Sequence, residues 1–446
     1  MKINVKVWKW SPPRILVSGF AIIIFIGAFL LSMPFASASG ERLPFLDALF
    51  TATSATCVTG LVVVDTGTYF SIWGQIILLA LIQLGGLGFM TMATLVALVL
   101  RKKISLRERL ILQEAMNQSS MEGIVRLIRK VIFYSLTIEL AGAALLAGRF
   151  AADMPLGKAV YYGIFHSISS FNNAGFDIFG DYRSLTLYVS DPVVNITAIL
   201  LVVLGGLGFV VMSDLLELRK NRKLSLHSKV VLSMTGALIA VGFLVVFVFE
   251  FTNHLTLGAL DWGGKLLASL FQSVMPRTAG YNSLDLTVLR QATQFFIILL
   301  MFIGASPGST GGGIKTTTFA VLVGSVIAMV RGREDIVLFR YRLGKDRIFK
   351  ALTITLFAMA LVISVTMLLS MLEDQSFIKL LFEATSAFGT VGLSLGVTPE
   401  LSEGGKIIIA LTMFVGRLGL LTLAYALGPG ADKELFRYPE GKITIG

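Results

Sequence analysis

Four glycines at regular spacing are the residues of this sequence whose chemistry can be inferred first. Gly60, Gly175, Gly280 and Gly392 are separated by 115, 105 and 112 residues. Each ends a stretch of small and hydroxyl-bearing residues, and the four stretches are FTATSATCVTGL (50–61), FHSISSFNNAGF (165–176), LFQSVMPRTAGY (270–281) and FEATSAFGTVGL (382–393). Glycine permits a backbone with positive φ, and a ring of backbone carbonyls can replace the hydration shell of a monovalent cation. These segments therefore predict cation binding by main-chain oxygens.

The composition indicates that lipid surrounds much of the chain. Hydrophobic residues make up 55% of the 446 residues and charged residues 15%, where about 25% charged is ordinary for a soluble protein. The net charge of +11 lies in short runs between apolar segments, so we expect anionic membrane lipid and not nucleic acid as a partner. The single cysteine, Cys57, predicts no disulfide, and the spacing of the three histidines predicts no metal site beyond an alkali-ion site.

Eight apolar stretches are long enough, or nearly long enough, to span a membrane. They run over residues 15–33, 75–100, 131–147, 193–213, 230–251, 295–330, 351–372 and 406–428, and only 295–330 is expected to be interrupted. Lys and Arg concentrate in the N-terminus and in 101–130, 219–229 and 331–350. Because cytoplasmic loops carry the basic excess, the sequence predicts a multi-pass cell (plasma) membrane protein with both termini in the cytoplasm.

The spans and the glycine segments combine into one repeated unit. Each glycine segment falls between two spans and is long enough for a re-entrant half-helix with an extended tail. The predicted fold is an all-α integral membrane protein with four tandem span–re-entrant pore loop–span repeats arranged pseudo-fourfold around one central pore. The expected boundaries are 1–115, 116–225, 226–340 and 341–430, followed by a cytoplasmic C-terminal tail, 431–446.

The second span of each repeat carries a glycine motif, and the third copy differs from the others. The motifs are LGGLGF (84–89), LGGLGF (204–209), IGASPGS (303–309) and VGRLGL (415–420). Glycines there allow close helix packing, which is the simpler interpretation of most of them. Proline and five glycines between 304 and 313 cannot continue a helix. We hypothesise a mobile intramembrane loop over 304–316 that gates the pore, against the alternative of a passive helix break. The gate residues are Gly304, Ala305, Ser306, Pro307, Gly308, Ser309, Thr310, Gly311, Gly312, Gly313 and Arg417.

Two basic residues lie in or shortly after the glycine motifs of the second spans. Arg417 takes the place of a motif glycine, and an arginine mid-membrane costs ~2.5–3.5 kcal/mol on insertion scales, so it should face the pore or a partner. It either opposes cation passage, anchors the loop through its carbonyls, or pairs with Asp214 or Glu139. Residues 308–313 have the glycine spacing of a phosphate-binding loop, but Ile314 breaks that motif before Lys315. Nucleotide binding is therefore rejected, and Lys315 is expected to reach the cytoplasmic side or an acidic partner.

The sequence resembles a known family at these motifs. Residues 389–393 (GTVGL) come close to the T-V-G-Y-G filter of potassium channels, and the four loops with the interrupted sixth span resemble the Trk/Ktr/HKT superfamily of potassium transporters over essentially the whole chain. Within it, the likeness is greatest to the membrane subunits of bacterial Ktr systems. The resemblance implies potassium uptake with K⁺ as the transported ion, Na⁺ as a candidate activator, a homodimer, and a cytoplasmic RCK-type nucleotide-binding regulatory ring. By motif, it assigns the filter carbonyls to Val58, Thr59, Gly60, Asn173, Ala174, Gly175, Thr278, Ala279, Gly280, Thr390, Val391 and Gly392.

Two other classes of protein compete with this interpretation. A sodium-coupled solute carrier also uses discontinuous helices, but it predicts two inverted halves with paired breaks, whereas this sequence predicts four parallel units and one break. An intramembrane enzyme needs a catalytic constellation within the spans, and none is found, so we expect no enzymatic activity and no organic cofactor.

Overall fold

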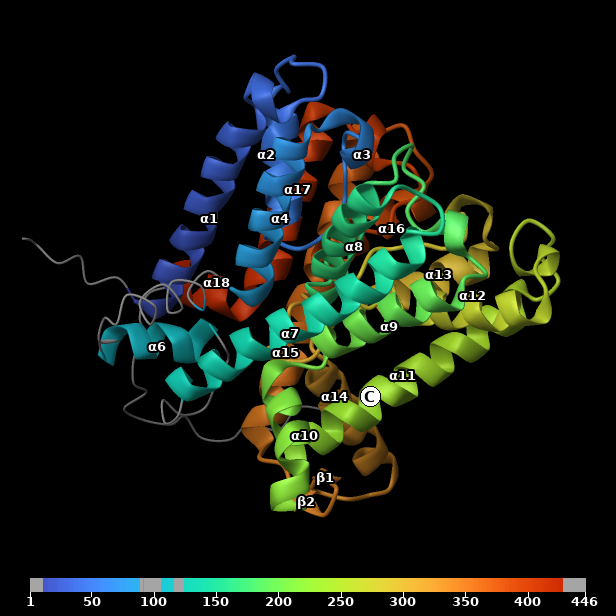
Figure 1. Cartoon of the computed structure of the whole chain (residues 1–446). Coiled ribbons are helices and arrows are strands. Elements are labelled where there is room, and N and C mark those ends of the chain that lie inside the picture. The colour runs from blue at the N-terminus through green and yellow to red at the C-terminus, as the bar shows by residue number, and fades with distance from the viewer. Residues whose placement is uncertain (1–10, 89–90, 92–105, 116–123, 428–446) are drawn as a thin grey trace, which may run out of the picture.

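The computed structural model describes residues 11–88, 91, 106–115 and 124–427, and its regular secondary structure in this part of the chain consists of helices, one short hairpin and isolated bridges, joined by loops (Figure 1). The first half contains α1 (Pro12–Leu31), α2 (Phe45–Thr56), α3 (Thr66–Tyr69), α4 (Ile72–Leu87), α6 (Leu106–Ala115), α7 (Ile124–Phe150), α8 (Leu156–Phe171), α9 (Pro192–Gly206) and α10 (Phe209–Asn221). The second half contains α11 (Leu226–Glu250), α12 (Trp262–Val274), α13 (Gln291–Phe302), α14 (Thr316–Val330), β1 (Val337–Leu338), β2 (Tyr341–Arg342), α15 (Lys345–Leu372), α16 (Phe377–Gly389), α17 (Glu403–Leu418) and α18 (Leu420–Leu427). Short 3₁₀ turns lie at Pro34–Ala36, Thr186–Tyr188, Leu257–Ala259, Leu286–Val288 and Thr398–Glu400.

Within the described residues, four long helices are suited by length and composition to cross a membrane. They are α1, α7, α11 and α15, and α9 with α10 adds a fifth candidate if that bent pair counts as one span. Large apolar side chains on these helices are exposed, including Phe25 on α1, Leu244 on α11 and Phe357 on α15. Exposed apolar side chains along a helix of this length are expected where lipid, and not water, covers the surface.

Each long helix is followed by a half-length helix and an extended return. The half-length helices α2, α8, α12 and α16 have 12, 16, 13 and 13 residues, too few to span a bilayer. Their C-terminal halves are almost entirely buried, hydroxyl-bearing residues such as Thr53, Ser170 and Ser386 included. The glycine segments predicted from the sequence are thus half-helices that enter the protein interior and then turn back.

The end of each long helix is tied to the start of the next apolar helix. The ties are Ser71 Oγ to Phe35 O at 2.6 Å, the Arg149–Asp191 ion pair, Arg290 N to Glu250 Oε1 at 3.0 Å, and Ser402 N to Glu373 Oε1 at 3.1 Å. These bonds differ in chemistry but close the same unit each time: long helix, half-helix, extended return and second helix.

The sequence predicted an interruption in only one second span, that of the third repeat (295–330), and this expectation is wrong. The interruption at the third is present, because α13 ends at Phe302 and α14 begins at Thr316. However, α9 and α10 are also bent by 103°, and α17 is separated from α18 by Gly419. The last motif glycine of the other three spans has the same left-handed backbone, with φ 83° at Gly88, 92° at Gly208 and 82° at Gly419. Since residues with a Cβ resist positive φ, these glycines end helices, and only at Gly208 would a Cβ also meet a close neighbour, Pro307 O at 2.6 Å.

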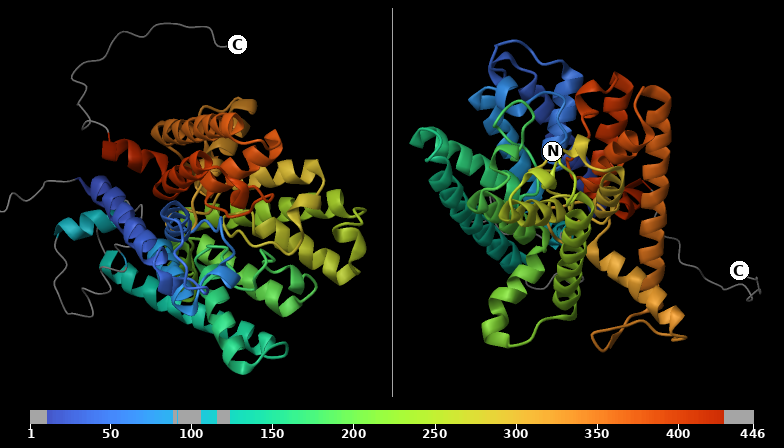
Figure 2. Two further views of the ribbon diagram at one scale, coloured as in Figure 1. Left: turned by 90° about the horizontal axis from the view of Figure 1, so that it is seen from above. Right: turned by 90° about the vertical axis from the view of Figure 1, so that its right-hand side faces the viewer.

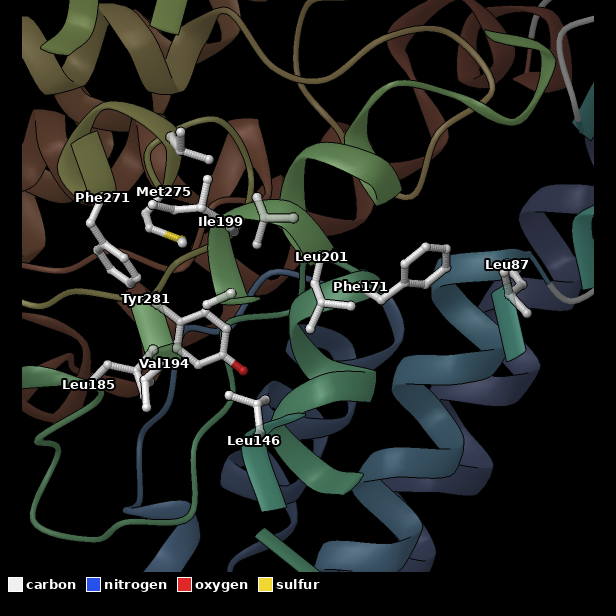
Figure 3. Packing of buried hydrophobic residues seen from close by; sticks show 14 of the residues in the cluster. Leu87, Leu146, Phe171, Leu185, Val194, Ile199, Leu201, Phe271, Met275 and Tyr281 are labelled. Atoms are coloured by element: carbon white, nitrogen blue, oxygen red, sulfur yellow. The ribbon is translucent and has the colours of Figure 1, made fainter. Parts of the chain in front are cut away.

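Helices from successive quarters of the chain follow one another around the molecule. Seen from above, the blue, green, yellow and red helices occupy successive sectors around a common middle (Figure 2). A large apolar cluster lies between the second and third of these groups and contains Phe171, Leu201 and Tyr281 (Figure 3). This packing holds the extended returns after α8 and α12 beside each other.

Candidate ion-binding site

The four glycines found in the sequence meet at one cavity. Gly60, Gly175, Gly280 and Gly392 all line a single hollow of about 410 Å³, which we call the glycine-lined cavity. Four acidic residues also line it: Asp65, Asp177, Asp285 and Glu400. Segments that lie more than 300 residues apart in sequence are therefore brought together in one place.

The contacts between the four glycines form a closed cycle. A Cβ added to any one of them would lie only 2.2–2.7 Å from a backbone carbonyl oxygen of the next segment. The pairs are Gly60 with Ala174 O, Gly175 with Ala279 O, Gly280 with Val391 O, and Gly392 with Thr59 O. Real side chains do not approach oxygen so closely, so glycine is required for space as well as for backbone conformation.

The three residues that end at each glycine have alternating backbone handedness. We call them the triplets: 58–60, 173–175, 278–280 and 390–392. The first and third residue of every triplet have positive φ, for example 59° at Val58 and 94° at Gly60, and the middle residue does not. Positive φ at β-branched Val58 is an outlier that only the surrounding structure can impose. Alternating handedness turns successive N–H groups to one side of the chain, and the carbonyls consequently turn to the other.

The N–H side of the triplets is bonded to the preceding half-helix. In the first segment, Ser54 accepts from Thr59 N through its carbonyl at 2.8 Å and from Gly60 N through Oγ at 3.1 Å. Ser386 makes the same two bonds to the fourth triplet, at 2.9 and 3.1 Å. In the second segment Ser169 O accepts from the middle residue, and in the third Met275 O replaces serine. With their N–H groups held from behind, the triplets can present carbonyl oxygens to a shared axis.

All twelve residues assigned by motif belong to these triplets; eleven are buried and Gly392 is partly buried. A cluster of backbone oxygens facing one axis suits a dehydrated monovalent cation, which carbonyl dipoles solvate without a formal charge. The half-helices add to this, because helix C-termini carry partial negative charge, and α2, α8, α12 and α16 all end just before a triplet.

The interrupted segment between α13 and α14 lies against the triplets. Ser306 N donates to Gly206 O at 3.0 Å and Phe209 N donates to Gly308 O at 2.9 Å, so the segment docks on the break between α9 and α10. Gly312 N donates to Thr390 Oγ1 of the fourth triplet at 3.0 Å. The same segment borders a second hollow of about 270 Å³, the loop-lined cavity.

Arg417 links the segment between α13 and α14 to α4, the second helix of the first unit. Its guanidinium donates to Thr310 O, to Gly85 O and, at 3.0 Å, to Gly86 O. Of the three alternatives from the sequence, anchoring through loop carbonyls matches these bonds. The ion-pair alternative is wrong, because Asp214 bonds Ser225 and Ser228 and Glu139 bonds Gln83 and Asn172.

The acidic partner expected for Lys315 is wrong, whereas its expected position on the cytoplasmic side stays a prediction. Its ammonium donates to Gly311 O at 2.7 Å and to Gly312 O at 3.4 Å, within its own loop. An acidic partner is unnecessary because the loop turns two of its carbonyls toward the amine. Lys315 and Arg417 therefore both hold the loop by main-chain oxygens.

Two buried polar groups behind the triplets were missed by the sequence analysis. Asn172 donates to Gln83 Oε1 at 2.7 Å and to Glu139 Oε1 at 3.2 Å, joining α4, α7 and α8. Arg277 is 7% exposed and donates to Thr235 O at 3.4 Å. Both residues lie three positions before a triplet glycine. This shared position is the sequence pattern from which they could have been identified.

This architecture defines a helical membrane protein whose four half-helices converge on one cavity. A family model described as cation transport protein, TrkH, matches residues 13–428. The chain therefore belongs to the TrkH family of cation transport proteins, and the resemblance inferred from the four loops is confirmed.

Similar proteins span the chain almost completely. It is 45% identical to Ktr system potassium uptake protein B of Bacillus subtilis over 99% of both chains. It is 41% identical to the protein of that name in Vibrio alginolyticus, over 98% of this chain and 96% of that one. It is 38% identical to potassium/sodium uptake protein NtpJ of Enterococcus hirae, over 98% of each. The crystal structure of the potassium transporter TrkH from Vibrio parahaemolyticus matches 95% of this chain and 86% of that chain with a TM-score of 0.74 at 18% identity, which supports the fold.

Proposed function

We propose that this protein takes up potassium across the cell membrane through a pseudo-fourfold pore formed by four span–re-entrant loop–span repeats. The repeats are 1–115, 116–225, 226–340 and 341–430. The observation that carries the proposal is the closed cycle of contacts among Gly60, Gly175, Gly280 and Gly392 around one cavity. A cycle of four similar units around one axis is the arrangement that a carbonyl filter requires.

The transported ion is K⁺, coordinated by the carbonyls of the four triplets. The relatives named potassium uptake proteins support this assignment, as does glycine at all four filter positions. The name of the Enterococcus protein includes sodium, and we assign Na⁺ the role of an activator of uptake.

The loop 304–316 and Arg417 form the gate in this proposal. The loop lies between the triplets and the loop-lined cavity, and Arg417 holds it to the backbone of α4. The glycine-lined cavity then faces the outside and the loop-lined cavity the cytoplasm, with both termini and the tail 431–446 inside, as the basic segments predict. Opening requires the loop to leave the position that the structure describes.

The protein acts with partners in this proposal. The resemblance implies a homodimer and a cytoplasmic RCK-type nucleotide-binding ring, and the word "system" in the names of two relatives is consistent with more than one component. The chain itself supplies the ion pathway.

Ion uptake by a filter-glycine variant tests the proposal. Uptake of K⁺, Rb⁺ and Na⁺ is measured in a host that lacks its own potassium uptake, comparing wild type with Gly392→Ser. The added side chain would overlap Thr59 O, 2.2 Å from the Cβ position, so we expect K⁺ uptake to fall at least tenfold relative to Na⁺ uptake.

The matched control is Gly396→Ser. Gly396 also has positive φ, 85°, but its Cβ position meets no atom within 4 Å. This variant carries comparable backbone strain without touching the triplets, and we expect it to keep the wild-type ion preference. If Gly392→Ser folds and keeps that preference too, the filter assignment is wrong.

A further inference from the structure

The loop is held by the first residue of the triplets. These four leading residues are Val58, Asn173, Thr278 and Thr390, and each is 0% exposed. Three of them have polar side chains and the fourth, Val58, has none. The polar three are joined directly or through each other to the loop between α13 and α14.

Hydrogen bonds connect the loop to the polar leading residues. Gly312 N donates to Thr390 Oγ1 at 3.0 Å. The Asn173 amide lies 3.2 Å from Thr310 Oγ1 and 3.0 Å from Thr278 Oγ1, and it bridges them in either orientation of the amide. The loop is therefore hydrogen-bonded to side chains of the proposed filter residues.

The approach is close enough to require glycine in the loop. A Cβ on Gly311 would lie 2.2 Å from Thr278 Oγ1, and one on Gly312 would lie 2.4 Å from Thr390 Oγ1. The loop backbone thus occupies the space next to these two hydroxyls. Any ion that leaves the triplets toward the loop-lined cavity has to pass the same oxygens.

The first repeat supports a specific role for these oxygens. Val58 offers no hydroxyl, and near α4 the loop is instead tied by Arg417, which bridges Thr310 O to Gly85 O. Among the four leading residues, those with polar side chains are the ones linked to the loop, and Arg417 ties the loop to α4.

We propose that the leading hydroxyl of Thr390 binds either the gate loop or a potassium ion, with Thr278 contributing through its bond to Asn173, so that arrival of potassium at the inner end of the filter releases the loop. This inference rests on the proposed function, because it assumes that the triplets are a filter and the loop a gate. A hydroxyl oxygen that accepts from Gly312 N–H faces the positive end of that dipole, and a cation on the same oxygen would be repelled by it. Potassium therefore binds the loop-released state more tightly, which is the differential affinity that a conformational shift requires.

A labelling experiment tests the coupling without relying on transport. Ser309 borders the loop-lined cavity and lies on the loop, and Ser309→Cys in a Cys57→Ser background provides a single thiol. In liposomes, the rate of its modification by a charged thiol reagent from the loop-lined side reports loop position. We expect the rate to rise at least threefold when K⁺ or Rb⁺ replaces Na⁺ on the opposite side.

Two variants of Thr390 separate the hydroxyl from its surroundings. Thr390→Val gives the fourth repeat the side chain found naturally at Val58, and labelling should then be fast in Na⁺ and insensitive to K⁺. Thr390→Ser keeps the oxygen and should keep the potassium-dependent rise. Thr278→Val is the second site, with an intermediate effect, and size-exclusion profiles identify variants that fail to fold.

The outcomes distinguish this inference from the proposed function. Equal labelling in K⁺ and Na⁺ in the wild-type background, or a potassium-dependent rise that survives in folded Thr390→Val, would overturn the inference. If the same liposomes still show potassium-selective uptake that Gly392→Ser abolishes, only the inference fails. If Gly392→Ser keeps the ion preference, the filter itself is refuted.

Discussion

At the scale of single residues, the proposed filter depends on backbone conformation that few side chains tolerate. Val58 adopts φ 59° although it is β-branched, and Thr278 and Thr390 adopt 77° and 49°. Such conformations cost of order 1–3 kcal/mol each and persist only where neighbouring contacts enforce them. The N–H groups of the triplets donate to Ser54 and Ser386. These bonds stabilise the strained backbone from residues close to it in the sequence.

Asp177 makes a pH dependence testable at this scale. It lies in the return after the second triplet and lines the glycine-lined cavity. Burial raises the pKa of Asp177 to about 7, with a further rise from the nearby Asp65 carboxylate, although the Phe179 N–H opposes it. Below that pH the carboxyl is neutral and no longer attracts cations. Loss of one nearby charge is worth on the order of 1 kcal/mol at an effective dielectric between those of protein and water.

We therefore expect the apparent KM for K⁺ to rise roughly fivefold as the pH on the glycine-lined side falls from 8 to 6. Asp177→Asn should show the higher KM throughout and no dependence in this range. The comparison variant is Asp181→Asn, which removes an exposed carboxylate paired with Arg183 and should retain the wild-type profile. Radiotracer uptake at fixed ionic strength measures both, and a pH dependence that persists in Asp177→Asn would contradict the assignment.

At the scale of elements, the second helix of each unit is interrupted at its glycine motif. In the third unit the interruption is a longer loop. In the other three units, glycine at the end of the motif ends the helix with φ between 82° and 92°. In the third copy the chain leaves the helix at Ile303 and returns to a bridge with it at Ile314. A break at the same register in several units is expected for the proposed fourfold repeat and not for the paired halves of a sodium-coupled carrier.

The geometry of the third break allows the loop to be removed cleanly. The Cβ position of Gly304 lies 3.0 Å from the Cα of Gly313, so deleting residues 305–313 joins two points that already touch. We expect this deletion to raise K⁺ flux several-fold in folded protein, because nothing then lies against the triplets. Flux in proteoliposomes is the measurement, and unchanged or lower flux would refute the gate.

Arg417 offers a second test of the same element. Arg417→Gln removes the positive charge and the guanidinium that donates to both Thr310 O and Gly85 O. Because the loop is then no longer tied to α4, we expect faster transport. Arg417→Lys keeps the charge, but an ammonium lacks the planar fork that holds two carbonyls. Wild-type flux in the lysine variant would indicate that charge limits transport, and glutamine-like flux would indicate the bridge. Wild-type kinetics in folded Arg417→Gln would remove Arg417 from the gate.

Sequence patterns predicted the elements better than their breaks and contacts. The long helices follow from hydrophobic length, and the four half-helices follow from the spacing of Gly60, Gly175, Gly280 and Gly392. Gly208 and Gly419 were not predicted to end helices, because glycine in an apolar span also permits close packing. The partners of Lys315 and Asn172 could not be predicted, since they depend on where the loop and α7 lie in three dimensions.

At the scale of the whole molecule, a ring of consecutive units has to be closed by contacts between its first and last members. The half-helix α2 packs against α17, and α1 packs against α18. Arg14 Nε donates to Ala426 O at 2.8 Å, and Lys406 pairs with Asp47 at 2.6 Å. These bonds span 412 and 359 residues and, like the contact between Gly392 and Thr59 O, join the first and last units.

The Lys406–Asp47 pair is the sharpest test of this closure. Its side chains are 17% and 18% exposed, so the pair is better shielded than a surface ion pair, for which ~0–1 kcal/mol is usual. We expect Lys406→Met and Asp47→Asn each to lower the thermal midpoint in detergent by a few degrees. The double variant should be no less stable than the weaker single variant, since the second change removes a bond already lost.

Selectivity separates ring closure from simple stability. If the pair positions the first triplet against the fourth, Lys406→Met should also lower the preference for K⁺ over Na⁺. Lys379→Met is the control, because Lys379 bonds Gln375 at 3.3 Å just before α16 and bridges no distant segments. Additive losses in the double variant, or unchanged ion preference in Lys406→Met, would mean that the cycle of glycines is held by the packing of α2 on α17 and does not depend on this ion pair.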